Sequence, residues 1–269
     1  GDGTSDSDVN LTGQRIDLLL AKLLRIDVDK PATGKPYGIP ANNPFLDHKN
    51  AAPETWALGF RNPWRLTCDD KTGQIWVGEN GQDTWESVKL INRGANYGWS
   101  VYEGSHPFYL ERTLGPGKLT GPTFEHHHRE ARSLTGGIVY YGKQLPELWG
   151  AYVYGDYSTG KIWAGKHDGQ KVLWHREIAD TPFAITGFAA DTNGNLIVID
   201  DHSGFHRLRP NQKVNQTPAF PRSLSETGLF RVTARHHVAV GVIPYSVNVP
   251  HWTDGAVSTH FIAMPGEEK

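Results

Sequence analysis

The chain has 269 residues, a formal net charge of −2, 38 % hydrophobic residues and 21 % charged residues. These values support a buried core, and they exclude a disordered chain and a basic surface for nucleic acid or an anionic membrane. No apolar run is long enough to span a bilayer, and Cys68 is the only cysteine, which excludes intrachain disulfides and thiolate zinc sites.

The first part of the chain predicts few regular elements. Residues 1–13 are polar and rich in Gly and Asp, which is typical of a loop. Residues 15–24 form the best helical stretch, and residues 24–29 alternate apolar and polar side chains as a strand does. Residues 31–53 contain five prolines and predict a long loop, which in a compact domain tends to be functional.

The stretch 58–65 places Arg61 and Asn62 directly before Pro63. Proline fixes its own φ and pushes the preceding residue toward an extended conformation, so both polar side chains are aimed at one place. A guanidinium suits a carboxylate or a quinone oxygen, and an amide can both donate and accept. The alternative is a structural arginine that holds a loop through its five donors.

A repeated pattern follows, with a turn glycine, a strand that has Val in its middle, and an acid six residues after the glycine. It occurs at residues 73–79, 150–156 and 194–200, each time followed by a second strand, with an inserted loop at about 98–135. A period of roughly 40–50 residues with several strands per unit indicates a β-propeller. The alternative is a chance similarity among the strands of an ordinary antiparallel protein.

Two further segments carry candidate ligands. Residues 79–83 (Glu-Asn-Gly-Gln-Asp) combine acid, amide and main-chain oxygens that suit Ca²⁺, although the strict calcium-loop pattern is absent and a polar turn is the alternative. In the run His126-His127-His128, the first and third side chains can face one point and act as a base or ligand. The alternative there is an exposed polar loop. Phosphate-loop, nucleophile-elbow and His-Glu-x-x-His patterns are absent.

The pattern fades from Asn211, and residues 217–222 have the composition of a linker. We therefore expect a partial β-propeller over residues 1–215, and a linker with the start of a separate C-terminal module over residues 216–269. The chain has no initiator Met and stops soon after an apolar run, so we expect it to be a segment of a longer protein.

A series of motifs in the same order resembles the glucose/sorbosone dehydrogenase family, the soluble PQQ-dependent aldose sugar dehydrogenases. The resemblance covers about residues 1–210, and Arg-Asn-Pro followed by Asn-Tyr-Gly-Trp is its most specific part. The matching motifs are residues 1–3, 23–27, 43–45, 59–63, 78–81, 91–92 and 94–99.

The resemblance implies a six-bladed propeller, of which this chain holds part, located in the periplasm or outside the cell. It implies that pyrroloquinoline quinone (PQQ) and Ca²⁺ lie on one face, and that an aldose transfers a hydride from C1 to the quinone. A small-molecule sugar is the expected partner, with no nucleic acid and no membrane span. The residues implied are Arg61 and Asn62 for the cofactor, Gly81 and Gln82 for the metal, and Asp2, His126, His128 and Arg129 for the substrate.

Several positions depart from the family pattern. The general-base histidine would precede residue 1, and Trp64 replaces a frequent Gln. A lysine that clamps the cofactor would fall near Ser158, and a pair of arginines near Ala184 and Thr186, none of which is charged here. The alternative function is therefore a non-catalytic propeller that has lost the cofactor and binds a carbohydrate or a protein. The identity of the sugar, the electron acceptor and the oligomeric state stay open.

Overall fold

The computed structural model describes residues 1–4, 6–210, 223, 227, 229–235, 237–239, 242–245 and 260–263. The chain divides into two compact units, Gly1–Pro210 and Asn211–Lys269. The boundary predicted between residues 215 and 216 lies outside the described residues. No helix in the described parts of the chain is long and apolar enough to cross a membrane.

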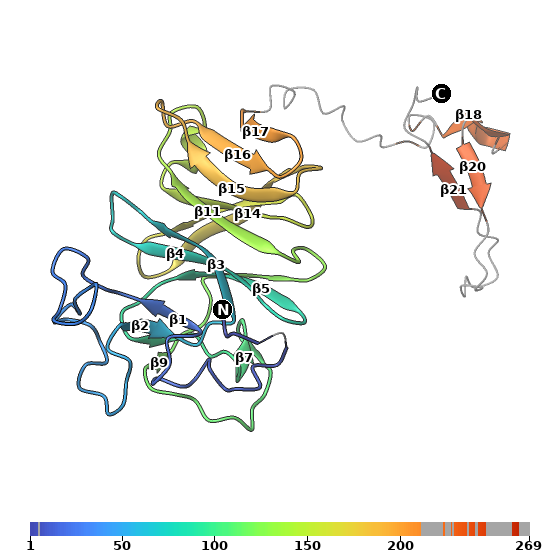
Figure 1. Ribbon diagram of the computed structural model, residues 1–269. Helices are drawn as coiled ribbons and strands as arrows, with labels where there is room; N and C mark the ends of the chain where they lie inside the picture. Colours follow the sequence, from blue (N-terminus) through green and yellow to red (C-terminus); the bar gives the residue numbers. More distant parts are fainter. Residues whose placement is uncertain are drawn as a thin grey trace. The chain divides into compact units, whose positions relative to one another are not determined.

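The unit Gly1–Pro210 contains three sheets that follow one another as blades of a propeller (Figure 1). The first blade has the strand order β10-β5-β4-β3, the second β11-β12-β13-β14, and the third β15-β16-β17. Their bounds are β3 Asn62–Cys68, β4 Ile75–Asn80, β5 Trp85–Leu90, β10 Phe124–His127, β11 Leu134–Tyr140, β12 Ala151–Asp156, β13 Lys161–His167, β14 Val172–Asp180, β15 Ile185–Ala190, β16 Leu196–Asp200 and β17 Gly204–Arg207. The predicted all-β propeller, with part of the ring in this chain, is confirmed.

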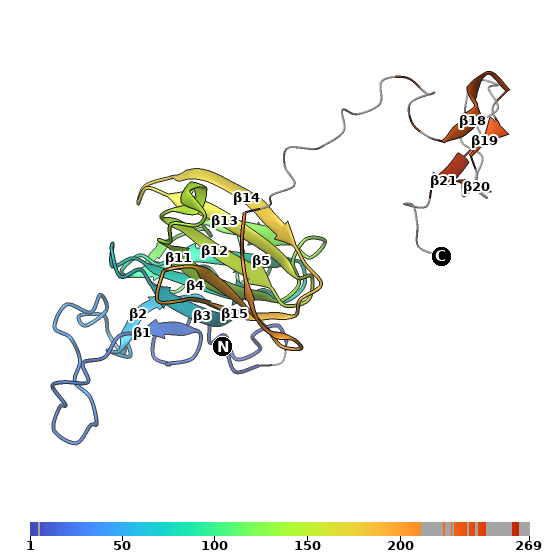
Figure 2. The same ribbon diagram turned by 90° about the horizontal axis from the view of Figure 1, so that it is seen from above.

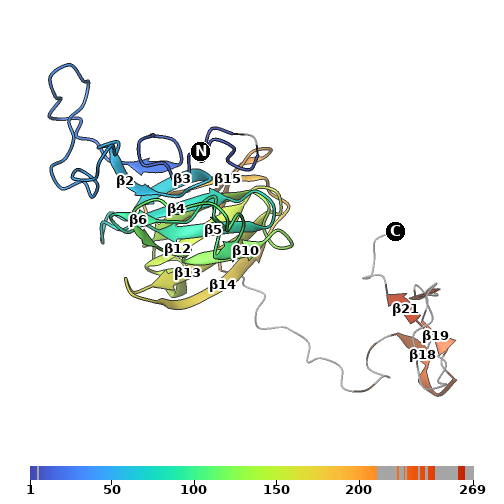
Figure 3. The same cartoon turned by 90° about the horizontal axis from the view of Figure 1, so that it is seen from below.

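The inner strand of each blade is the first of its sheet in sequence. Strand β11 contacts both β3 and β15, so the three inner strands lie in succession through the unit (Figure 1). In the second blade, β12 pairs with β11, and β12, β13 and β14 follow one another outward (Figure 3). The turn glycines of the predicted repeat, Gly73, Gly150 and Gly194, have φ of 70°, 73° and 76° and precede the second strand of their blades. These conformations favour glycine, which explains why the repeat is visible in the sequence.

Side chains that alternate along strand β12 contribute to the two cores on either side of the second blade. On β12, Tyr152 and Tyr154 belong to the aromatic cluster shared with the first blade, and Ala151 and Val153 to the aliphatic cluster shared with the third. Successive side chains of a strand point to opposite faces, so a strand buried on both faces alternates between two cores. In the aromatic cluster the ring of Trp76 stacks on that of Tyr152, with centroids 4.8 Å apart.

A fourth sheet, in the order β1-β2-β6-β9, combines two strands from before the first blade with two from the segment between β5 and β10. Its bounds are β1 Lys22–Leu24, β2 Thr55–Leu58, β6 Ala95–Asn96 and β9 Lys118–Leu119. Strand β9 comes from the predicted inserted loop, and β6 lies just before that loop. Strand β6 pairs in parallel with β2, and β9 pairs in parallel with β6. The same insertion forms the hairpin β7 Tyr102–Glu103 with β8 His106–Pro107. The inserted loop thus returns the chain to this sheet before β10 completes the first blade.

The helix predicted at residues 15–24 is wrong. Residues up to Ala21 form turns, and Lys22–Leu24 is strand β1. Ala21 has φ +57°, which interrupts a right-handed helix, and Leu19 and Leu20 are each 47 % exposed, so no continuous apolar face is buried. The predicted strand at 24–29 is likewise shorter and earlier, with an isolated bridge from Asp27 to Gly38. The proline-rich segment 31–53 is a long loop that extends away from the blades (Figure 2).

The remaining elements are short. A 3₁₀ turn, η1 Pro146–Leu148, lies before β12. In the unit Asn211–Lys269 the described strands form two antiparallel pairs, β18 with β19 and β20 with β21. Their bounds are β18 Phe230–Val232, η4 Thr233–Arg235, β19 His237–Val238, β20 Val242–Tyr245 and β21 His260–Ala263.

Candidate functional site

One edge of the blades gathers residues that lie far apart in the sequence. It is the edge at which β3, β11 and β15 begin and β4, β12 and β16 end, here called the axial edge. The antiparallel register pairs Asn62 with Asn80, Leu134 with Asp156, and Ile185 with Asp200. The Arg-Asn motif, the calcium candidates and the clamp positions all lie at or beside this edge.

The acids of the repeat have a structural role at the axial edge. Each accepts a hydrogen bond from a main-chain N–H just before or at the start of an inner strand: Arg61 to Glu79 Oε1 at 2.7 Å, Ser133 to Asp156 Oδ2 at 2.6 Å, and Ala184 to Asp200 Oδ1 at 2.7 Å. Glu79 also forms a buried ion pair with Lys89. Because a carboxylate that accepts such bonds holds the approaching chain in place, these acids set the entry of each blade.

Asp2 ties the N-terminus to the Arg-Asn motif. Its main-chain N–H donates to the carbonyl oxygen of Arg61 at 2.8 Å, and its Oδ2 accepts the indole N–H of Trp99 at 2.9 Å. Asp2 is 5 % exposed. The predicted substrate residue Asp2 and the predicted cofactor residue Arg61 are therefore brought together. The carboxylate of Asp2 holds the side chain of Trp99.

Arg61 and Asn62 are half-buried and only weakly engaged with the protein. Arg61 Nη1 lies 3.4 Å from the carbonyl oxygen of Asn80, and its guanidinium carbon lies 6.0 Å from the ring centroid of Trp99. The side-chain amide of Asn62 donates to Asn80 Oδ1, also at 3.4 Å. Bonds of this length are weak, so donors of both side chains remain available to a ligand.

The loop with Gly81 and Gln82 follows Asn80 directly and is held by two buried acids. Glu103 accepts the main-chain N–H groups of Gln82 and Asp83 at 2.5 and 2.6 Å, and Glu86 accepts that of Gly81 at 3.2 Å. The Gln82 side-chain oxygen accepts the N–H of Ser7 at 2.6 Å. Within the described residues, no group of three or more His, Cys, Asp or Glu side chains is placed to hold a metal.

Glu86 connects this loop to the second blade and to His128. The carboxylate is fully buried and accepts Asn80 Nδ2 at 2.8 Å, the N–H of Leu134 at 2.8 Å and His128 Nε2 at 3.1 Å. Burial raises the pKa of Glu86, and the bonds from Asn80, Leu134 and His128 oppose that rise. The His128 side chain is 24 % exposed, so it retains a face toward solvent beside the axial edge.

The structure places His126 and Arg129 differently from His128. His126 is 2 % exposed, and its ring nitrogens lie 2.8 Å from the Tyr154 hydroxyl and 3.1 Å from Glu130 Oε2. Its ring packs against Trp163 within the aromatic cluster between the first and second blades. This burial does not support the substrate contact expected of His126. Arg129 is exposed on the turn after β10.

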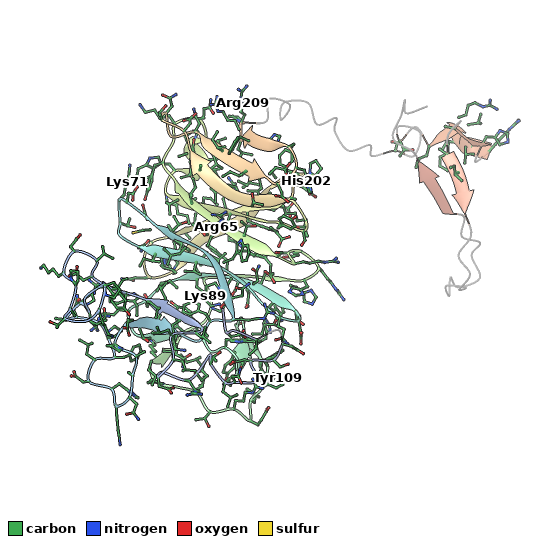
Figure 4. All side chains as sticks on the ribbon, in the orientation of Figure 1. Arg65, Lys71, Lys89, Tyr109, His202 and Arg209 are labelled. Carbon is green, nitrogen blue, oxygen red and sulfur yellow. The ribbon has the colours of Figure 1, made fainter. Side chains whose placement is uncertain are left out.

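A cavity of about 490 Å³ opens beside the Arg-Asn motif. Its lining comes from all three inner strands and the turn after β12, namely Trp64, Arg65, Ser133, Thr135, Tyr157, Ile185 and Thr186. The Trp64 residue is 60 % exposed. Arg65 reaches across the inner strands, where its Nε donates to the carbonyl oxygen of Thr186 at 2.8 Å (Figure 4).

The three expected clamp positions lie around this cavity. Thr186 lines it, Ala184 directly precedes the lining residue Ile185, and Ser158 directly follows the lining residue Tyr157. None of the three is a cation. The sequence did not predict three charged residues of the site, Arg65, Glu86 and Glu103. Each is an isolated charge in the sequence, and its contacts depend on the register between strands.

The sequence profile of the family described as Glucose / Sorbosone dehydrogenase matches residues 2–208. Among curated proteins, the HIPL1 protein of Arabidopsis thaliana is 37 % identical over 187 residues, which cover 61 % of this chain and 27 % of that protein. The aldose sugar dehydrogenase YliI of Escherichia coli is 32 % identical over 207 residues, covering 74 % of this chain and 53 % of that protein. The human Hedgehog-interacting protein is 32 % identical over 142 residues, covering 50 % of this chain and 17 % of that protein.

Solved structures show the same fold. A glucose dehydrogenase crystal structure superposes with a TM-score of 0.59 at 25 % identity, covering 75 % of this chain and 57 % of that one. The PQQ-bound aldose sugar dehydrogenase of Streptomyces coelicolor has a TM-score of 0.52 at 22 % identity, covering 73 % of this chain and 49 % of that one. The chain thus spans about a quarter of the HIPL1 protein and about half of the solved dehydrogenases.

Proposed function

Because this chain belongs to the glucose/sorbosone dehydrogenase family, we propose that it forms part of the cofactor and substrate face of a PQQ- and Ca²⁺-dependent aldose dehydrogenase. The observation that carries the proposal is the meeting of Asp2, Arg61, Asn62 and the loop at Gly81 on one edge, beside a cavity of about 490 Å³. The proposed location is the periplasm or the exterior of the cell.

The donors at the axial edge fit a planar group with carboxylates and quinone oxygens. The weak bonds of Arg61 and Asn62 leave a guanidinium and an amide free to donate, which are the groups that recognise such oxygens. When bound, PQQ supplies a two-electron oxidant that accepts the hydride of the sugar. The main-chain oxygens of Gly81 and Gln82 are the ligand type that Ca²⁺ prefers, and Glu86 and Glu103 fix the loop that carries them.

Other residues position these groups and contact the sugar. Asp2 holds Trp99 against Arg61 through the indole N–H, so it orients the guanidinium indirectly. His128, paired with Glu86 and partly exposed, is suited to bind a substrate hydroxyl, and Arg129 is exposed on the same turn. The histidine that takes the hydroxyl proton is assigned to a position before residue 1, as the family resemblance implies, so no residue of this chain is given that role.

Dye reduction by the full-length protein tests the proposal. With PQQ, Ca²⁺ and an aldose, we expect reduction of an artificial electron acceptor, loss of that activity on removal of the metal, and recovery when Ca²⁺ is restored. Arg61→Ala should remove the activity, whereas the matched control Arg207→Ala, on the exposed end of β17, should not. Absence of aldose-dependent reduction in the reconstituted wild-type protein would contradict the proposal.

A second function is favoured by the uncharged clamp positions Ser158, Ala184 and Thr186. A non-catalytic propeller that binds a carbohydrate or a protein needs no cofactor clamp, and one relative is named Hedgehog-interacting protein. This function predicts ligand binding at the axial edge in the absence of PQQ. Binding of a sugar or protein that Arg61→Ala weakens, together with no uptake of PQQ, would favour it over the dehydrogenase.

A further inference from the structure

We infer that Arg65 is the anion-binding residue of the axial cavity, where its guanidinium binds a carboxylate of a planar aromatic ligand. The inference deepens the proposed function, because PQQ belongs to that ligand class. It rests, however, on the geometry of Arg65 and the cavity, and it can be tested with a simpler carboxylate. Three observations carry it: the register of the inner strands, the placement of the guanidinium, and the charge of the cavity lining.

The register gives Arg65 counterparts in the next two blades. Each inner strand has a bulge near its start, and the residue after the bulge is Arg65 in β3, Gly136 in β11 and Gly187 in β15. A Cβ on Gly136 would lie 3.2 Å from Cβ of Arg65, and one on Gly187 would lie 3.3 Å from its guanidinium carbon. The two glycines therefore make room for a side chain that starts in the first blade and crosses the second to reach the third.

The guanidinium is anchored at one donor. Arg65 Nε donates to the carbonyl oxygen of Thr186 at 2.8 Å, and within the described residues no protein acceptor takes Nη1 or Nη2. A guanidinium presents its donors as a rigid fork that matches a carboxylate in two parallel bonds. The Nε bond fixes the plane of the fork, and the terminal nitrogens stay available.

The cavity lining selects for negative charge. Of the seven residues that line it, Arg65 carries the one formal charge, and the others are aromatic, hydroxyl or aliphatic. Trp64 adds an exposed indole from the same strand. An anionic ligand with a flat aromatic body matches this combination of a fork and a ring.

The Arg65 guanidinium also occupies a place where the family resemblance calls for a cation that clamps the cofactor. Thr186 is one of the sites at which the family resemblance calls for an arginine, and it is the residue whose carbonyl oxygen receives Arg65 Nε. The charge missing from β15 is thus delivered to the same place by a side chain from β3. On this account, the uncharged residue at 186 does not remove the cation from the cavity.

Calorimetric titration of the full-length protein with two probes tests the inference, namely PQQ with Ca²⁺, and benzene-1,3,5-tricarboxylate without metal. Arg65→Gln removes the charge, and Arg65→Gly installs the residue found at the equivalent positions of the next two blades. Both variants should lower the affinity for each probe by about tenfold to a hundredfold, the usual loss for a charge-assisted bond. Arg65→Lys should recover part of that affinity. Thermal unfolding checks that each variant folds.

Arg176→Gln is the matched control, because Arg176 is an exposed arginine beside Trp174 on the outer strand β14. It should leave both affinities unchanged. Arg65-dependent binding of the tricarboxylate without any PQQ uptake would support the inference and sink the proposed dehydrogenase. The inference is overturned if Arg65→Gln binds PQQ as well as the wild type does, if neither probe binds the wild type, or if Arg176→Gln weakens binding equally.

Discussion

Glu86 Oε1 lies 3.1 Å from His128 Nε2, and the same buried carboxylate accepts the main-chain N–H of Leu134 at the start of the next blade. One acid therefore joins a residue at the rim of the site to the junction between the first and second blades. The position of His128 depends on this junction, because the loop and the blade entry share one acceptor.

Glu86→Gln should lower the free energy of unfolding by about 1–3 kcal/mol, because an amide turns donors toward groups that need an acceptor. Urea unfolding measures this loss. Glu111→Gln, at an exposed position, is the control and should change the stability by less than about 0.5 kcal/mol. Equal urea midpoints for Glu86→Gln and the wild type would refute this role of Glu86.

The stability of the first two blades should fall in mild acid. Burial lowers the pKa of His126, and Glu130 opposes that shift. A depressed folded-state pKa contributes stability that is present above the unfolded value of about 6.5 and is lost as the pH falls through the lower folded value.

Melting temperatures from pH 7 downward measure this dependence. In His126→Asn the melting temperature should fall less steeply below pH ~6.5, because the variant lacks a buried group whose protonation destabilises the folded state. His48→Asn, at an exposed position, should follow the wild type. An unchanged slope in His126→Asn would show that other groups cause the acid sensitivity.

Asp156→Asn tests the structural role of the repeated acids. Asp156 is fully buried and accepts main-chain N–H groups of Ser133, Ser158 and Thr159 at 2.6, 2.9 and 2.8 Å. An asparagine retains one acceptor oxygen, so we expect a loss of about 1–3 kcal/mol in the free energy of unfolding. Asp180→Asn, on the exposed end of β14, should be near neutral by the same denaturant titration. A wild-type midpoint for Asp156→Asn would remove the basis for this role.

Trp64→Gln should separate binding from stability. The Trp64 residue is 60 % exposed and lines the cavity, so its loss should change the free energy of unfolding by less than about 0.5 kcal/mol. The affinity for PQQ should fall about twofold to tenfold, as expected for one lost aromatic contact. Leu66→Ala, at a 50 % exposed residue of the same strand that does not line the cavity, is the control. Unchanged PQQ affinity in Trp64→Gln would place the ligand elsewhere.

The blades were predictable because each repeat unit carries its own local signals. Gly73, Gly150 and Gly194 adopt positive φ at a turn, and an acid at a fixed distance binds the chain that enters the blade. The family resemblance assigned Asp2 to the substrate and Arg61 to the cofactor, and their main-chain contact appears only in the structure. The helix at 15–24 failed because the conformation of Ala21 and the exposure of Leu19 and Leu20 depend on tertiary structure.

The rest of the site could not be obtained from the sequence. Arg65 appears there as one more charge after Trp64, and its counterparts Gly136 and Gly187 emerge from the bulge register of three strands. Glu103 lies about 20 residues beyond the loop that it holds, and it belongs to the short hairpin inside the insertion. Contacts of that kind depend on how an irregular loop folds back, which no periodicity encodes.

Calorimetric titration of the full-length protein with PQQ in the presence of Ca²⁺ tests the central proposal most directly. The account predicts saturable uptake at micromolar PQQ by the wild-type protein and loss of that uptake in Arg61→Ala, with the thermal stability of the variant retained. No uptake by the wild-type protein at those concentrations, with calcium present, would contradict it.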